Sequence, residues 1–257
     1  MFGSSHLRKL LIVACLTASP MVAASSAGEA MTQLNAIMAD DTKRQASYEA
    51  GHERIRFCGY CHGEDGNSKR DYIPNLAAQH PLYLFNQFEK FRDGTREDYV
   101  MSKLAQTLSL EERIDIAVYY SQQTAKPRTG GDPTKADAGE KLFAVRCAGC
   151  HGDKAQGFRD MPRLAGQPAE YLGIALRRFK EMDPTKHSTP MIGVAGILSE
   201  GEIEALAGYL AGSELSVAIL DNSIVEILFI EHTSSEPTST QFWRKILVDS
   251  VKFLRSV

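Results

Sequence analysis

The 257-residue sequence lacks a marked excess of either charge. Its 29 lysines and arginines stand against 32 aspartates and glutamates, which gives a formal net charge of −3. Proteins that bind nucleic acid usually show a basic excess, so this balance argues against nucleic acid as a partner. A hydrophobic content of 43% and a charged content of 24% are ordinary for a globular protein and do not indicate disorder.

The sequence also lacks an apolar run long enough to cross a membrane. The run at 10–16 is followed by Pro20 and several serines, well short of the ~20 apolar residues that a span needs. Basic residues precede the run and small residues follow it at 23–27, which is the pattern of a secretory signal peptide. We therefore predict a signal peptide over residues 1–27, cleaved within Ala24–Ala27, and an exported, periplasmic protein.

Cysteine is scarce, with five in the whole chain. Cys15 falls in the predicted signal peptide, where Ile12–Cys15 resembles a lipoprotein cleavage box that we rank below ordinary cleavage. The other four form two C-x-x-C pairs, each followed at once by a histidine. These segments are Cys58–Gly59–Tyr60–Cys61–His62 and Cys147–Ala148–Gly149–Cys150–His151.

C-x-x-C-H is the attachment pattern of c-type haem. Two residues between the thiols place both sulfurs on one side of a helical turn, where they can form thioethers with the two vinyl groups of a porphyrin. The adjacent histidine then presents a nitrogen to the iron. The sequence predicts two covalently bound haem c groups. The attachment residues would be Cys58, Cys61, Cys147 and Cys150, and the iron-ligating histidines His62 and His151.

Three other uses of these cysteines fit the sequence less well. A thioredoxin-like redox pair expects an α/β domain, whereas this chain is predicted to be helical. A zinc site could use both pairs, but they lie about ninety residues apart in separate repeats. Ordinary disulfides are the default in exported proteins, but they leave the repeated histidine unexplained.

The two motifs lie in an internal repeat. The C-x-x-C-H segments are offset by 89 residues, and Pro74–Gln79 corresponds to Pro162–Gln167 at an offset of 88. Farther along, Leu108–Ser109 corresponds to Leu198–Ser199 at an offset of 90. The small drift indicates single-residue insertions within a tandem duplication.

Hydrophobic periodicity predicts three main helices in each repeat. The first leads into the motif, over 42–57 in one copy and 138–146 in the other, where Asp137 with Glu140 suits an N-terminal cap. The middle helix of the first copy ends at Gly94. The closing helices begin with capping boxes, Ser109 with Glu112 and Ser199 with Glu202.

A proline- and glycine-rich stretch without periodicity divides the chain into two domains. We predict domains at 40–124 and 135–213, a linker at 125–134 and a C-terminal extension at 214–257. The extension contains a basic, amphipathic stretch after Trp243, which would suit peripheral association with a membrane. A packing appendage or a poorly ordered terminus is the favoured interpretation of its role.

Each repeat also offers a methionine at an equivalent position. Met101 lies 39 residues after His62, and Met191 lies 40 residues after His151. A histidine-ligated iron used for electron transfer often has methionine as its second ligand, so we predict Met101 and Met191 as the sixth ligands. Met161 and Met182 have no counterpart in the first repeat. The alternative ligands His80 and His187 do not correspond to one another and rank low.

These segments resemble class I cytochromes c, and the tandem arrangement resembles the bacterial di-haem cytochrome c4 family, over about residues 40–213. The resemblance implies an all-α fold of two tandem class I cytochrome c domains, each wrapped around a covalent haem c. It also implies His/Met ligation, with the Pro74 and Pro162 carbonyls orienting the two histidines. The second repeat reads DKAQG where the first has EDGNS, a departure that affects no ligand.

The resemblance also implies a periplasmic role that delivers electrons to a terminal oxidase. An iron with two protein ligands has no open position for substrate, and methionine opposite histidine raises the reduction potential. We therefore expect an electron carrier and not an enzyme, with redox partners such as a quinol-oxidising complex and a terminal oxidase. One alternative is a cytochrome subunit of a dehydrogenase complex, for example in sulfur-compound oxidation. A di-haem peroxidase would need a haem that lacks its sixth ligand, so it ranks lower.

Overall fold

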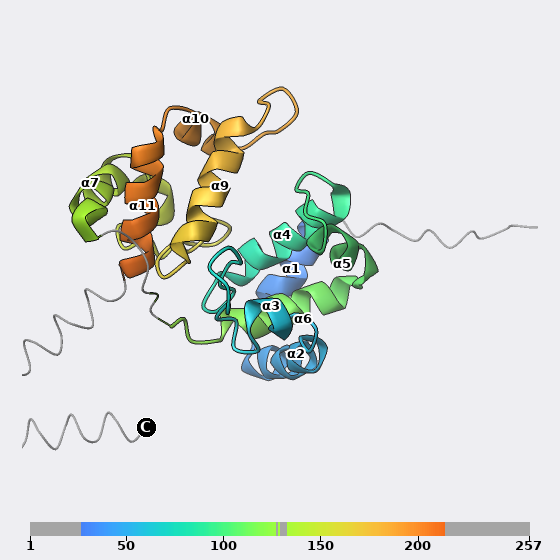
Figure 1. Ribbon diagram of the computed structural model, residues 1–257. Coiled ribbons are helices and arrows are strands. Elements are labelled where there is room, and N and C mark those ends of the chain that lie inside the picture. The colour runs from blue at the N-terminus through green and yellow to red at the C-terminus, as the bar shows by residue number, and fades with distance from the viewer. Residues whose placement is uncertain (1–26, 127, 129–132, 214–257) are drawn as a thin grey trace, which may run out of the picture.

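The computed structural model describes residues 27–126, 128 and 133–213. These residues form helices and loops, and the one β-type contact among them is an isolated bridge between Phe158 and Met161. Figure 1 shows two groups of helices, one coloured blue to green and the other yellow-green to orange. The predicted all-α fold is confirmed.

The first group of helices surrounds one hydrophobic core. In chain order they are α1 (Ala27–Met38), α2 (Asp41–Arg54), α3 (Gly59–His62), α4 (Pro81–Asp93), α5 (Met101–Thr107) and α6 (Leu110–Ser121). Helix α6 buries seven of its 12 residues and contacts α1, α2 and α4, so it forms the centre of this domain.

The second group repeats this order around its own core. A short 3₁₀ turn, η1 (Pro133–Lys135), leads into the helices α7 (Ala136–Arg146), α8 (Ala148–His151), α9 (Ala169–Glu181), α10 (Pro190–Gly196) and α11 (Glu200–Gly212). They correspond in sequence order to α2 through α6. The duplication seen in the sequence is therefore reproduced helix by helix.

The helix termini follow largely from local sequence. Both predicted capping boxes form. The Ser109 and Ser199 hydroxyls accept hydrogen bonds from the backbone N–H groups of Glu112 and Glu202, and the carboxylates of these glutamates accept from the backbone N–H groups of the same serines. Gly94 ends α4 in the left-handed conformation, with φ of 80°.

Two expectations about the first helix of each repeat were wrong. Asp137 does not cap α7, because η1 runs directly into the helix and places Asp137 inside its first turn. The helix expected over 42–57 ends at Arg54, and its C-cap residue Ile55, which leaves the helical conformation with ψ of 1°, is buried in the core at 3% exposed. The chain then re-enters a separate helical turn, α3.

Helix α1 precedes the boundary at residue 40 that the sequence predicted for the first domain. Its Ala30 and Leu34 side chains are buried and belong to the core that α2, α4 and α6 form. The first domain therefore begins before residue 40, with helix α1.

Each domain brings its first and last helices together at a glycine. A Cβ atom on Gly51 of α2 would lie 2.2 Å from the Asp115 carbonyl oxygen of α6. A Cβ atom on Gly139 of α7 would lie 2.2 Å from the Ala205 carbonyl oxygen of α11. Only glycine permits this approach of the helix backbones, so the crossing is the same in both repeats.

The two domains meet through the segments that follow the motifs. The Gln167 side chain accepts from the backbone N–H of Asn75 at 2.9 Å and donates to its carbonyl at 2.8 Å. In the same way, the Gln79 side chain bonds to the backbone N–H and carbonyl of Arg163, at 2.8 and 3.0 Å. Since Gln79 and Gln167 are equivalent in the repeat, the interface is reciprocal.

Some predicted segments lie wholly or largely outside the described residues. These are the signal peptide up to residue 26, the extension 214–257 and most of the linker. Among the helices that the structure does describe, none is both long and apolar enough to span a bilayer. Where the linker begins, Lys126 is attached to the first domain by a hydrogen bond from its backbone N–H to Asn67.

The glycine crossing leads to a stability prediction. Gly139→Ala should lower the free energy of unfolding of the second domain by about 1–3 kcal/mol, because the added methyl group overlaps the α11 backbone. The measurement is urea-induced unfolding of the holoprotein, monitored by helical circular dichroism.

The matched control is Gly201→Ala in α11, where an added Cβ meets no atom within 4 Å. Alanine should leave stability unchanged there or increase it by up to ~1 kcal/mol through helix propensity. Equal stability of the two variants would show that the helices do not need this close contact.

Candidate haem sites

In the first domain the motif forms a single helical turn. The backbone N–H of His62 donates to the Cys58 carbonyl at 2.9 Å, and that of Cys61 donates to the same carbonyl at 3.2 Å. Cys58 is the N-cap residue of α3, and Cys61 and His62 lie on the helix. Both thiols therefore lie within one turn, directly beside the histidine.

The second motif repeats this geometry. His151 and Cys150 donate backbone hydrogen bonds to the Cys147 carbonyl, at 3.0 and 3.1 Å. The four described cysteines form no disulfide, and the two pairs lie in different domains. The structure thus brings each Cys–Cys–His set together but does not join the two sets in one site.

Each motif histidine is buried and oriented by a prolyl carbonyl. His62 is 8% exposed and His151 is 6% exposed. Nδ1 of His62 lies 3.0 Å from the Pro74 carbonyl oxygen, and Nδ1 of His151 lies 3.0 Å from that of Pro162. A carbonyl only accepts, so Nδ1 carries the proton and Nε2 remains available to a metal.

The protonation states agree with this assignment. Burial lowers the pKa of both His62 and His151, although the prolyl hydrogen bond partly opposes the shift. Both imidazoles are therefore neutral, as iron ligation requires. Burial also raises the pKa of the Cys58 and Cys147 thiols.

The two predicted methionine ligands begin short helices that are capped differently. Met101 starts α5, and its backbone N–H donates to the Asp98 carboxylate at 2.8 Å. Met191 is the second residue of α10, and its N–H donates to the Thr189 hydroxyl at 3.4 Å. Both side chains are half-buried, and Met101 packs against the core of its domain. The structure thus places the pair at equivalent points of the fold.

The remaining candidate ligands have other places in the fold. Nε2 of His80 lies 2.9 Å from the Gln156 carbonyl oxygen of the second domain, so this nitrogen is engaged at the interface. His187 lies in the turn after α9, where its backbone N–H donates to the Asp183 carbonyl. Met161 lies in an isolated bridge, and Met182 is the C-cap residue of α9.

The donor set fits a haem c in both domains. Each site offers two unpaired thiols on one helical turn and a neutral imidazole whose Nδ1 is already bonded. Each domain also contains a methionine at an equivalent point of the fold, Met101 or Met191, and a thioether with an imidazole is the ligand pair of an electron-transfer haem. Cys58, Cys61 and His62 would hold the group in the first domain, and Cys147, Cys150 and His151 in the second.

Sequence reasoning missed two tyrosines that support the first motif. The Tyr120 hydroxyl donates to the Gly63 carbonyl at 3.3 Å, and the Tyr119 hydroxyl donates to the Glu64 carbonyl at 2.9 Å. These bonds attach the loop after His62 to α6. The one available signal was the repeat itself, since Tyr119 recurs as Tyr209.

The surfaces beside the two motifs differ. In the first domain Phe57, Tyr60 and Tyr99 are 69%, 73% and 82% exposed. The equivalent residues of the second repeat are Arg146, Gly149 and Thr189. The second repeat therefore has no aromatic side chain at the positions of these three exposed aromatic residues.

Comparison with known proteins gives consistent matches. The cytochrome c family model matches residues 136–214. The chain is 37% identical over 186 residues to cytochrome c4 of Stutzerimonas stutzeri, covering 64% of this chain and 88% of that protein. It is 34% identical to the thiosulfate dehydrogenase electron acceptor of Thiomonas intermedia, covering 66% of this chain and 85% of that protein.

Solved structures agree with these matches. The crystal structure of reduced recombinant cytochrome c4 from Pseudomonas stutzeri superposes with a TM-score of 0.60 at 34% identity, covering 64% of this chain and 97% of that one. The thiosulfate dehydrogenase TsdBA from Marichromatium purpuratum superposes with a TM-score of 0.54 at 31% identity, covering 64% of this chain and 40% of that one.

The methionine positions generate a ligand test. Met101→Ala and Met191→Ala should each open one iron, so that the reduced protein binds carbon monoxide at about one haem per chain. Met161→Ala and Met182→Ala are the controls, because neither residue has a counterpart in the first repeat. The measurement is a carbon monoxide titration followed by absorbance. Equal carbon monoxide binding by all four variants would remove Met101 and Met191 from the ligand set.

Proposed function

Because the chain belongs to the cytochrome c4 family, it is an electron carrier with two covalently bound haem c groups, and we propose that it shuttles single electrons in the periplasm from a respiratory donor to a terminal oxidase. The pairing of two equivalent donor sets supports this proposal. Both buried imidazoles are oriented by a prolyl carbonyl at 3.0 Å, in matching positions of two copies of one domain.

The proposed assignment gives every donor one role. Cys58 and Cys61 attach the first haem, and Cys147 and Cys150 attach the second. His62 with Met101 ligates the first iron, and His151 with Met191 ligates the second. When bound, a haem iron with histidine and methionine ligands exchanges one electron at a raised reduction potential.

The chain's own residues prepare the sites for this exchange. The prolyl carbonyls fix the tautomer and orientation of the imidazoles, which limits the rearrangement that accompanies a change of iron charge. The two cores exclude water from the side of each histidine, since His62 and His151 are both buried. Burial in an apolar surrounding is one of the factors that set a haem potential.

A second candidate function is acceptance of electrons from a partner dehydrogenase of sulfur compounds. The similarity to the thiosulfate dehydrogenase electron acceptor favours it specifically, because the match covers 85% of that protein. In this function a separate enzyme performs the chemistry and the chain takes up the released electrons. Both functions use the same haem ligands and differ only in the donor.

Peroxidase activity ranks below both carrier functions. It would need a haem without a sixth protein ligand, and the two methionines occupy equivalent positions at the starts of α5 and α10. Periplasmic location and a signal peptide over residues 1–27 belong to the same proposal.

The first experiment measures haem attachment. The full chain, expressed in the periplasm with the c-type maturation system, should give two haems per polypeptide in a pyridine haemochrome assay. Its denatured mass should be higher by two haems, and the reduced native protein should bind little carbon monoxide. A chain without covalent haem, or ready carbon monoxide binding at both irons, would contradict the proposed ligation.

The second experiment distinguishes the two donors. Stopped-flow absorbance follows reduction of the di-haem protein by a purified quinol-oxidising complex and by a purified thiosulfate dehydrogenase. Faster reduction by the quinol-oxidising complex is the result that we expect. Reduction by the dehydrogenase alone would favour the second function.

A further inference from the structure

The helices that carry Met101 and Met191 have little to stabilise them by themselves. Helices α5 and α10 have seven residues each, and a helix shorter than about 12 residues is only marginally stable in isolation. The residue that each helix buries fully is Ala105 in α5 and Ala195 in α10. Contacts at the two ends of each helix therefore contribute strongly to fixing the place of its methionine.

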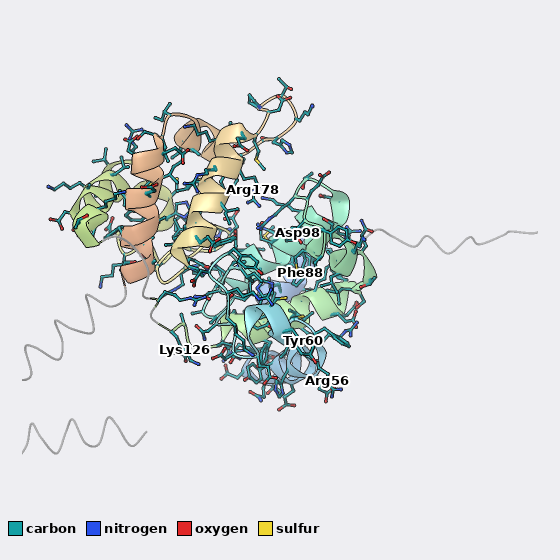
Figure 2. The ribbon with its side chains drawn as sticks, in the orientation of Figure 1. Arg56, Tyr60, Phe88, Asp98, Lys126 and Arg178 are labelled. Carbon is teal, nitrogen blue, oxygen red and sulfur yellow. The ribbon has the colours of Figure 1, made fainter. Side chains whose placement is uncertain are left out.

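At the start of these helices the two domains use different caps. The Asp98 carboxylate accepts from the backbone N–H of Met101 at 2.8 Å (Figure 2), whereas the Thr189 hydroxyl accepts from that of Met191 at 3.4 Å. A hydrogen bond to a charged acceptor is shorter and stronger than one to a neutral acceptor. The caps alone do not hold the two methionines equally.

At the other end, a cationic side chain holds the same carbonyl in both domains. The Arg113 guanidinium donates to the Leu108 carbonyl, and the Lys180 ammonium donates to the Leu198 carbonyl at 2.6 Å. Leu108 and Leu198 are equivalent in the repeat, and each lies between its methionine helix and the closing helix. The link that follows each methionine helix is thus anchored by a charge-assisted hydrogen bond.

The two donors come from different helices. Arg113 lies on α6, at a position where the second repeat has Ile203. Lys180 lies on α9, at the position that Arg92 takes on α4. The contact is therefore present in both domains although the residue that makes it has changed, which indicates that both domains require the contact itself.

The charges of the two donors are balanced differently. Arg113 is 6% exposed, and its Nε atom lies 2.7 Å from Oε1 of Glu89 on α4. Oε2 of Glu89 also accepts from Arg92 at 2.8 Å. Lys180 is exposed, so its charge is solvated and needs no buried partner. The first domain thus joins α4, α6 and the end of α5 through an ion pair, and the second uses a single lysine.

We propose that Arg113 and Lys180 are positioning residues that keep Met101 and Met191 bound to iron, an inference that rests on the haem ligation proposed above. Each cation fixes the far end of a short helix whose first turn carries the methionine. Without the cation that end is released, and the carbonyl loses its charged donor. The methionine then leaves the iron more often, while the histidine side of the site is unchanged. Neither cationic side chain touches the iron.

The test is displacement of methionine by cyanide in the ferric, full-length di-haem protein. Cyanide binds the iron only after methionine has left it, so the rate at saturating cyanide reports methionine dissociation. Stopped-flow absorbance should give one phase for each haem. The Met191→Ala variant identifies the phase of the second domain, because that phase becomes fast.

Lys180→Met should accelerate the phase of the second domain about tenfold and leave the other phase unchanged, because a hydrogen bond from a charged donor is lost in one domain only. Lys180→Arg should restore the original rate, since it restores a charged donor. The matched control is Lys141→Met. Lys141 is an exposed lysine of α7 in the same domain, and it forms no hydrogen bond or ion pair with the residues that the structure describes.

The first domain provides a second variant. Arg113→Met should accelerate the other phase, and Arg92 still pairs with Glu89 in this variant, so the carboxylate keeps a cationic partner. Urea-induced unfolding is measured on every variant. If Lys180 had a merely structural role, Lys180→Met would lower the stability of the protein without changing the rate of methionine dissociation, and the proposal would be overturned.

The far-red charge-transfer band of ferric haem, which is present only while a thioether sulfur is bound, is recorded first in the unmodified protein. Its absence would count against the proposed ligation itself. If the band is present and Lys180→Met changes neither phase, this inference alone is overturned. The same conclusion follows if Lys141→Met accelerates the phase of the second domain as much as Lys180→Met does.

Discussion

The hydrogen bond between a buried imidazole and a prolyl carbonyl is the constraint on which the rest of the structure depends. It fixes the tautomer of His62 and of His151 and leaves one nitrogen of each for a metal. The same segments continue directly into the residues that join the domains, Asn75 and Arg163. Orientation of the two buried histidines and docking of the two domains are therefore one structural feature, and a change to either should alter the other.

The two domains share the contacts that hold their helices together and differ in the residues near the motifs and the methionines. Both domains retain the glycine at the helix crossing, the capping box of the closing helix and the glutamine that bridges the interface. The cap before the methionine differs, with Asp98 in one copy and Thr189 in the other. The first domain exposes aromatic residues at Phe57, Tyr60 and Tyr99, where the second has no aromatic side chain. Two sites with the same proposed ligands thus have unequal environments, which is a physical basis for unequal potentials and for distinct partners.

The features that could be predicted from sequence are those that depend on local chemistry. Capping boxes, the left-handed Gly94 and the spacing of thiols and histidine each involve residues close in the chain. The predicted end of α2 was three residues too late, because hydrophobic periodicity indicates that a helix is present but does not fix its last residue. Helix α1, the glycine crossing and the interface glutamines were missed because they depend on contacts between distant segments. The methionine assignment came from the repeat, because one domain provided the register for the other.

The most direct measurement of the central claim, two irons each ligated by histidine and methionine, is a proton NMR spectrum of the reduced protein. A methionine methyl group bound to low-spin iron lies over the porphyrin face, where the ring current shifts its resonance far upfield. We predict two such methyl resonances, one from Met101 and one from Met191. A spectrum with one shifted methyl resonance, or with none, would contradict the account.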